Sequence, residues 1–195
     1  MTNKYDPIAL FEEWFEEAKN DSRIVEPTAF TLATATKDGV PSARIVLLKD
    51  FSSEGFVFYT NLTSKKGIEL KDNPLASLCF YWEEIGKQVR IDGAVNKVQE
   101  KDADAYFATR PRERQLSAWA SKQSVMLEDM KVLEERITLI DEDFKGMDIP
   151  RPPFWSGYVV SPDVIEFWER GQYRRHKRDL FTRVANGWQH EMLYP

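Results

Sequence analysis

The sequence predicts an α+β fold that is mainly β, with an antiparallel sheet closed or nearly closed into a barrel and helices at its periphery. β-Branched and apolar runs separated by short turn sequences fill most of the middle of the chain, whereas helical spacing is found mainly at the start and in the second half. Closure would remove the exposed edges that five short strands otherwise carry. With 195 residues, 42% of them hydrophobic, the chain can bury one core, and we expect a single domain over residues 1–195.

The first element that the sequence predicts is an amphipathic helix over about residues 6–19. Asp6 supplies its cap and Pro7 its first turn, and the apolar residues that follow have helical spacing. Strands are predicted at residues 28–36 and 43–48, joined by the turn Lys37-Asp38-Gly39, and then at 55–61, 75–82 and 87–98. The segment after residue 61 is predicted to pass through a basic loop into a helix.

The second half of the chain returns to helical spacing before it ends in strands. Helices are predicted at residues 101–109 and 125–144, and a proline-rich segment at 150–153 marks their end. Strands are predicted at 157–160, 164–168, 180–184 and 187–193, with Ala185-Asn186-Gly187 as a hairpin turn. These C-terminal strands, at about 157–193, should rejoin the barrel and complete the fold.

The charge of the chain limits its classes of partner. The formal net charge is −5 and the pI is about 5.2, which argues against a general binder of nucleic acid or of membrane surfaces. Any anion binding must therefore be local. Cys79 is the single cysteine and cannot form an intrachain disulfide. The start of the chain has no signal pattern and no apolar stretch approaches the length of a membrane span, so we expect a soluble cytoplasmic protein.

One cluster of basic and aromatic residues suits a flat, anionic ligand. Within residues 168–181 the chain carries Trp168, Arg174, Arg175, His176 and Arg178. Arginine offers a planar fork of donors for phosphate or carboxylate, histidine exchanges a proton near neutral pH, and tryptophan offers a stacking face. A solvated basic loop is the alternative interpretation.

Two other segments have the composition of phosphate sites. In residues 58–67 a strand leads through a hydroxyl-rich loop to Lys65 and Lys66 at a helix start, where backbone donors favour an anion. A capped helix with a solvated basic turn fits that segment equally. In residues 106–114 three arginines, Arg110, Arg112 and Arg114, follow an aromatic pair at the end of a helix, where the helix dipole alone also favours cations.

Two weaker signals lie at residues 44–49 and 119–124. Strand alternation places Arg44 and Lys49 on opposite faces unless a bulge or the strand end redirects one of them, and an edge-strand arginine is the alternative interpretation. The polar residues after Trp119 indicate by themselves only a helix cap. Two phosphate-like sites far apart in the chain predict either a ligand with two anionic ends or two phosphorylated ligands that meet at one place.

Eight motifs, in order along the chain, carry a family resemblance. They are RIVLLK at 44–49, FYTN at 58–61, SKK at 64–66, QVR at 88–90, RPR at 110–112, WASKQS at 119–124, FWSG at 154–157 and IEFW at 165–168. Their combination resembles the pyridoxine/pyridoxamine 5′-phosphate oxidase family over nearly the whole chain. The resemblance implies an FMN-binding split barrel and a homodimer with two flavin sites at the subunit interface. It also implies oxidation of pyridoxine or pyridoxamine 5′-phosphate to pyridoxal 5′-phosphate, with O2 as acceptor and H2O2 as product.

The resemblance also implies roles for individual residues and no metal site. The residues implied to contact FMN are Arg44, Ile45, Val46, Leu47, Lys49, Tyr59, Thr60, Lys65, Lys66, Gln88, Gln123, Ser124, Trp168 and Arg178. The residues implied to contact the substrate are Lys49, Tyr106, Arg110, Arg114, Arg174 and His176. Arg174 and His176 are the implied catalytic pair over the pyridine ring. The implied reaction transfers a hydride from the substrate C4′ to the flavin, and His176 orients the ring or accepts a proton.

Departures from the family pattern bear on the substrate side of the site. Arg114 stands where many members have a serine, Lys177 where an acidic residue is common, and Arg170 where glycine is common. Well-known members have a longer N-terminal arm that closes over the substrate, and from the sequence before Asp6-Pro7 we expect this arm to be missing here.

Two alternatives to the main interpretation stay open at this point. One is a related flavin oxidase of phenazine biosynthesis, which acts on a larger tricyclic substrate. The other is a protein that binds FMN or pyridoxal phosphate without turnover. The presence of both Arg174 and His176 favours an enzyme.

Overall fold

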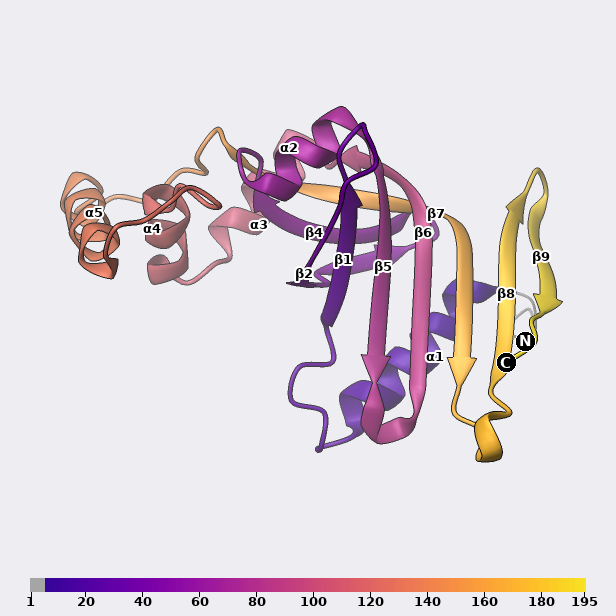
Figure 1. The fold of residues 1–195 in the computed structure, drawn as a ribbon. Helices are drawn as coiled ribbons and strands as arrows, with labels where there is room; N and C mark the ends of the chain where they lie inside the picture. Colours follow the sequence, from indigo (N-terminus) through magenta and orange to yellow (C-terminus); the bar gives the residue numbers. More distant parts are fainter. Residues whose placement is uncertain (1–5) are drawn as a thin grey trace.

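The computed structural model describes residues 6–195, in which nine strands form one antiparallel sheet that curls into a half-barrel (Figure 1). The strand order is β2-β1-β5-β6-β7-β4-β3, and β8 pairs with both β7 and β9. The strands are β1 (Ala29–Ala35), β2 (Pro41–Leu47), β3 (Asp50–Ser52), β4 (Gly55–Asn61), β5 (Leu75–Trp82), β6 (Lys87–Lys97), β7 (Trp155–Glu169), β8 (Lys177–Val184) and β9 (Gly187–Met192). The helices are α1 (Pro7–Asn20), α2 (Lys65–Asp72), α3 (Glu100–Ala108), α4 (Arg112–Ala120) and α5 (Met130–Asp143), with short 3-10 turns η1 (Glu83–Ile85) and η2 (Gln172–Arg174). The predicted class, α+β and mainly antiparallel β, is confirmed.

Strand β7 organises the sheet because it is long enough to pair with three other strands. Its first half pairs with β4 and its second half with β8, while β6 runs along its other edge. The β6–β7 register shifts at Asp92/Gly93, and a Cβ at Gly93 would lie 2.0 Å from the carbonyl oxygen of Ser161. Gly93 pairs with Pro162 at this bulge, and Figure 1 shows that β7 bends along its length. The separate strands predicted at 157–160 and 164–168 are therefore wrong, because they form one continuous strand.

The main core lies between α1 and the concave sheet. Asp6 caps α1 by accepting a hydrogen bond from the backbone N–H of Ile8 at 2.9 Å, as the sequence predicts. Phe11 is fully buried, and its ring centroid lies 4.9 Å from those of Phe51 and Phe56. Burial of each such ring contributes roughly 1.5–3 kcal/mol. The amphipathic helix therefore closes the inner side of the sheet, as its apolar spacing indicates.

Helices α3, α4 and α5 project from the end of the sheet that carries α2 (Figure 1). A small second core of Phe107, Leu116, Ile149 and Trp155 joins them to the sheet. Helix α4 was not predicted. Helix α5 begins at Met130 rather than at residue 125, and Asp129 is its N-cap. The short strand β3 was also not predicted.

The two predicted hairpins are confirmed. Gly39 takes φ 82° in the turn between β1 and β2, and Val184 pairs with Gly187 across the turn between β8 and β9. The assignment of residues 1–195 to a single domain stays a prediction. Within residues 6–195, no helix has both the length and the apolar character needed to cross a bilayer.

Candidate active site

A cavity of about 950 Å³ opens between β2, β4, the start of α2 and the α3–α4 segment. This volume is typical of sites for cofactors and small molecules. The predicted site residues that line it are Arg44, Ile45, Val46, Leu47, Lys49, Tyr59, Thr60, Lys65, Lys66, Tyr106, Arg110, Arg114, Gln123 and Ser124. The two phosphate-like sites of the sequence therefore meet in one cavity.

Arg44 and Lys49 both line this cavity, although strand alternation alone would separate them. Strand β2 ends at Leu47, so Lys49 lies in the connection to β3. The backbone N–H of Lys49 donates to the carbonyl oxygen of Val57 at 2.9 Å, which ties this connection to β4. Of the two features that the sequence analysis named, a bulge or the strand end, it is therefore the strand end that redirects Lys49.

The start of α2 presents a buried lysine to the cavity. Ser64 caps the helix, and Lys66 Nζ donates to Thr60 Oγ1 at 3.2 Å and to Gln123 Oε1 at 3.0 Å. Burial lowers the pKa of Lys66, and the charge of Arg44 lowers it further against the opposing effect of Glu69. A bound anion would relieve this cost, because an opposite charge restores the charged form.

A buried carboxylate orients Arg44, and sequence reasoning missed it. Glu69 Oε2 accepts from Thr34 Oγ1 at 2.5 Å, from Ser42 Oγ at 2.6 Å and from Arg44 Nη2 at 3.3 Å. Burial raises the pKa of Glu69, but the hydroxyl hydrogen bonds and the Arg44 charge outweigh it and leave the pKa below its ordinary range. The i,i+4 spacing of Lys65 and Glu69 is the sequence signal that could have indicated an acidic residue here.

Three stacked aromatic rings lie beside a second group of cationic residues, which consists of Lys49, Arg110 and Arg114. Tyr106 stacks on Tyr59 with ring centroids 4.0 Å apart, and Trp155 stacks on Tyr59 at 5.2 Å. The Arg110 guanidinium lies 4.8 Å from the Trp155 ring centroid. Arg110 Nη1 is buried and, among the described residues, has no hydrogen-bond partner. An unpartnered buried donor beside a cavity points to an anionic ligand.

Lys49, Arg110 and Arg114 lie close enough to repel one another. Burial lowers the pKa of Lys49, and the two arginines lower it further against the opposing charge of Glu26. The sequence placed Arg114 at the end of a helix, and this is wrong: α3 ends at Ala108, and Arg114 lies in the first turn of α4. The dipole at a helix start disfavours a cation, so the helix itself does not stabilise this charge.

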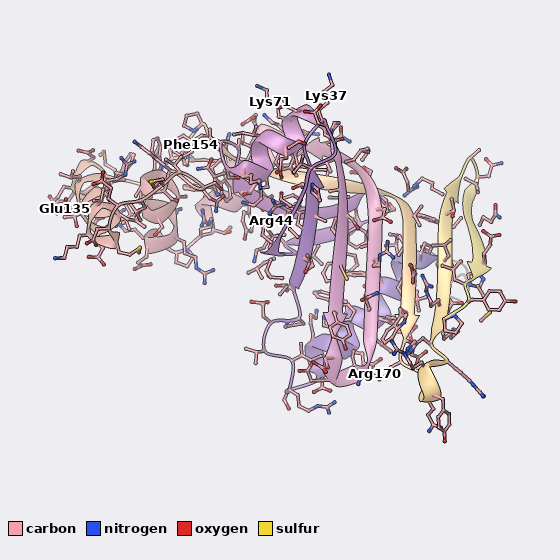
Figure 2. All side chains as sticks on the ribbon, in the orientation of Figure 1. Lys37, Arg44, Lys71, Glu135, Phe154 and Arg170 are labelled. Carbon is pink, nitrogen blue, oxygen red and sulfur yellow. The ribbon has the colours of Figure 1, made fainter. Side chains whose placement is uncertain are left out.

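The remaining predicted site residues do not line this cavity. Gln88, Trp168 and Arg178 occupy one row across β6, β7 and β8, because Gln88 pairs with Trp168 and Trp168 pairs with Arg178. Arg174 and His176 lie in the loop that follows β7. Figure 2 shows the separation, since Arg170 at the start of this loop lies at the opposite end of the sheet from Arg44.

The loop between β7 and β8 holds His176 in a defined orientation. Gly171 N–H donates to His176 Nδ1 at 3.3 Å, and the His176 ring lies 4.5 Å from that of Trp168. A Cβ at Gly171 would lie 1.9 Å from the carbonyl oxygen of Arg175. Because a backbone N–H can only donate, neutral His176 carries its proton on Nε2. Arg174 itself has φ 64°, a left-handed conformation that is rare for arginine.

No group of three or more potential metal ligands occurs within residues 6–195. The family model for pyridoxamine 5′-phosphate oxidase matches residues 16–142, and that for the pyridoxine 5′-phosphate oxidase C-terminal dimerisation region matches residues 155–195. The chain belongs to the pyridoxamine 5′-phosphate oxidase family.

Relatives of this oxidase family match the chain over nearly its whole length. A pyridoxine/pyridoxamine 5′-phosphate oxidase of Zymomonas mobilis subsp. mobilis is 50% identical over 97% of this chain and 98% of its own. One of Caulobacter vibrioides is 47% identical over 100% of this chain and 87% of its own. These relatives identify the protein as an oxidoreductase.

Solved structures confirm the split-barrel fold of the oxidase family. PhzG from Burkholderia lata 383, in complex with tetrahydrophenazine-1-carboxylic acid, has a TM-score of 0.92 and 34% identity, and the match covers 100% of this chain and 95% of that one. A pyridoxamine 5′-phosphate oxidase-related, FMN-binding protein from Nostoc punctiforme has a TM-score of 0.76 and 18% identity, and the match covers 95% and 97%.

Proposed function

We propose that this protein oxidises pyridoxine or pyridoxamine 5′-phosphate to pyridoxal 5′-phosphate, with FMN as cofactor and O2 as the acceptor that becomes H2O2. The observation that carries the proposal is that two cationic groups, one at the start of α2 and one around Arg110, line a single cavity. A flavin phosphate and a substrate phosphate are the two anions that they would bind. Relatives at 47–50% identity with this named activity support the same conclusion.

The residues at the start of α2 fit an FMN phosphate. Arg44, Lys65 and Lys66 carry three positive charges and Glu69 one negative charge, which leaves a net +2. A phosphate monoester carries nearly two negative charges at pH 7. The hydroxyls of Thr60 and Ser124, with the Gln123 amide, supply further polar groups. When bound, FMN supplies the two-electron redox chemistry.

The second cationic group fits the substrate phosphate. Lys49, Arg110 and Arg114 supply the charge, and Tyr106 supplies a hydroxyl. The unpartnered Nη1 of Arg110 is a donor that such a phosphate would satisfy. Anchoring both phosphates would fix the substrate ring against the flavin, and positioning of this kind contributes up to about 7–11 kcal/mol to catalysis.

We propose a homodimer in which each cavity is completed by a second copy of the chain. The row Gln88–Trp168–Arg178 and the loop with Arg174 and His176 lie outside the cavity of their own chain. All but Gln88 fall within the region that matches the C-terminal dimerisation model. In this arrangement Arg174 covers the substrate ring, and His176 contacts it through the Nε2–H donor.

The proposed function is tested by anaerobic reduction of the FMN-loaded protein with pyridoxine 5′-phosphate. We expect the flavin absorbance to bleach and to recover when oxygen is admitted, with pyridoxal 5′-phosphate formed. A protein that binds FMN and stays yellow with both phosphorylated vitamers would contradict the proposal. If only a reduced phenazine carboxylate bleached the flavin, the result would favour the phenazine alternative. The 34% identity to PhzG supports that alternative less than the 50% identity to a pyridoxine/pyridoxamine 5′-phosphate oxidase supports the proposed function.

A further inference from the structure

A buried carboxylate on β7, Glu166, holds Arg178 in place. We propose that Glu166 is a positioning residue for FMN binding that acts through Arg178. This inference rests on the proposed function, because it takes Arg178 as a flavin contact. It adds a residue to which neither the sequence motifs nor the cavity assigned a role.

The sheet register puts Glu166 on the same face as the flavin row. Glu166 pairs with Arg90 of β6, two residues along the strands from the Gln88–Trp168–Arg178 row. Side chains two residues apart on a strand share a face, so Glu166 and Trp168 lie on one side of β7. Glu166 is therefore a diagonal neighbour of Arg178 across the β7–β8 pair.

Both carboxylate oxygens of Glu166 are used to hold arginines. Oε1 accepts from Arg178 Nε at 2.7 Å, and Oε2 accepts from Arg90 Nη1 at 3.3 Å. The Glu166 side chain is only 7% exposed. A second bond, from Arg178 Nη1 to the carbonyl oxygen of Tyr194 at 2.9 Å, fixes the guanidinium from another edge. Among the described residues, Nη2 is then the Arg178 nitrogen without a partner.

This arrangement orders Arg178 before any ligand binds. A free arginine loses rotamer freedom on binding, whereas one held at Nε and Nη1 has already lost it on folding. Stability alone does not account for a buried carboxylate here, because the desolvation of such a charge offsets much of its attraction to its partners. Arg90 also has a second carboxylate nearby, since its Nη2 lies 3.7 Å from Asp92 Oδ2.

The test measures FMN affinity rather than turnover. In Glu166→Gln the carboxylate charge is lost with little change of shape, and we expect the FMN dissociation constant of the apoprotein, from a flavin fluorescence titration, to rise on the order of tenfold. The matched control is Glu17→Gln, which removes the 2.6 Å ion pair to Lys87 on the opposite face of β6. The control should leave FMN affinity unchanged.

A double-mutant cycle separates positioning from a general structural role. If Glu166 acts through Arg178, then adding Glu166→Gln to Arg178→Gln should cause no further loss of FMN affinity. Additive losses, or a lowered melting temperature of the apoprotein with unchanged FMN affinity, would overturn the inference. Glu166→Asp keeps the buried charge and should fold even if Glu166→Gln does not. Its shorter side chain should cause an intermediate loss of FMN affinity, and full FMN affinity in Glu166→Asp would also count against the inference.

Failure of this inference differs from failure of the proposed function. A wild-type protein that forms pyridoxal 5′-phosphate, with a Glu166→Gln variant of equal FMN affinity, would overturn only the role of Glu166. A wild-type protein that binds no FMN would overturn both.

Discussion

Burial beside Arg44 lowers the pKa of Lys66, and this predicts a pH dependence of FMN binding. As the pH rises through the lowered pKa the lysine loses its charge, so affinity should fall with rising pH, beginning below the ordinary lysine value of about 10.4. The phosphate does not titrate there, because its second pKa is about 6. The check is the FMN dissociation constant between about pH 7 and pH 10. In Lys66→Arg the FMN dissociation constant should depend less on pH, and the binding of riboflavin, which has no phosphate, should not show this pH dependence. An equal pH dependence in Lys66→Arg and the wild type would contradict the assignment of the effect to Lys66.

Arg114 adds a third cation beside Lys49 and Arg110, and its removal should affect the substrate alone. For Arg114→Ser we expect KM for pyridoxine 5′-phosphate to rise about fivefold, equal to about 1 kcal/mol for an exposed charge. The FMN dissociation constant should not change. Arg112→Ser is the matched control, because Arg112 pairs with Asp141 at 2.7 Å outside the cavity. A lower KM in Arg114→Ser would mean that Arg114 fills the pocket instead of binding the phosphate.

At the scale of elements, α2 depends on a glycine that lets its first turn lie against the loop from β4. A Cβ at Gly67 would lie 2.3 Å from the carbonyl oxygen of Leu62, so Gly67→Ala must displace the first turn and with it Lys66. We expect the free energy of unfolding to fall by about 1–3 kcal/mol and FMN affinity to fall with it. Chemical denaturation and a flavin titration measure the two effects. The control is Ile68→Ala, at a neighbouring side chain that is 53% exposed, and it should change neither the free energy of unfolding nor FMN affinity. Normal FMN affinity in Gly67→Ala would show that the position of Lys66 does not depend on this glycine.

Elements with strong local patterns could be predicted from the sequence, whereas those set by distant contacts could not. Strands β4 and β5 have the predicted bounds, because apolar runs between turn residues define them locally. Strand β7 was divided in two because Pro162 normally interrupts a strand, and only its position opposite Gly93 of β6 makes room for it. Helix α4 escaped prediction because its buried face is partly polar and includes Gln115.

At the scale of the whole molecule, the residues of the site could be predicted from the sequence. Their division into two groups that lie apart within one chain could not. The resemblance to the oxidase family assigned roles both to the residues that line the cavity and to Arg174, His176 and Arg178, which lie outside the eight motifs. Lys66 lines the cavity, whereas Trp168 and His176 lie elsewhere. This separation follows from sheet register and strand length, which no local sequence pattern encodes. The acidic residues Glu69 and Glu166, which hold the arginines, were missed because a buried carboxylate is recognised by its partners rather than by its neighbours in sequence.

This division predicts that two inactive variants can complement each other in a mixed dimer. Arg110→Ala disables the cavity of one chain, and Arg174→Ala disables the loop of the other. If each site takes its cavity from one chain and its loop from the partner, co-expressed chains form mixed dimers that have one intact site. Random pairing makes half of the dimers mixed, each with one working site of two, so we expect about a quarter of wild-type turnover. Each variant expressed alone should stay inactive, and a mixture of the two that is as inactive as its parents would show that both groups act within one chain.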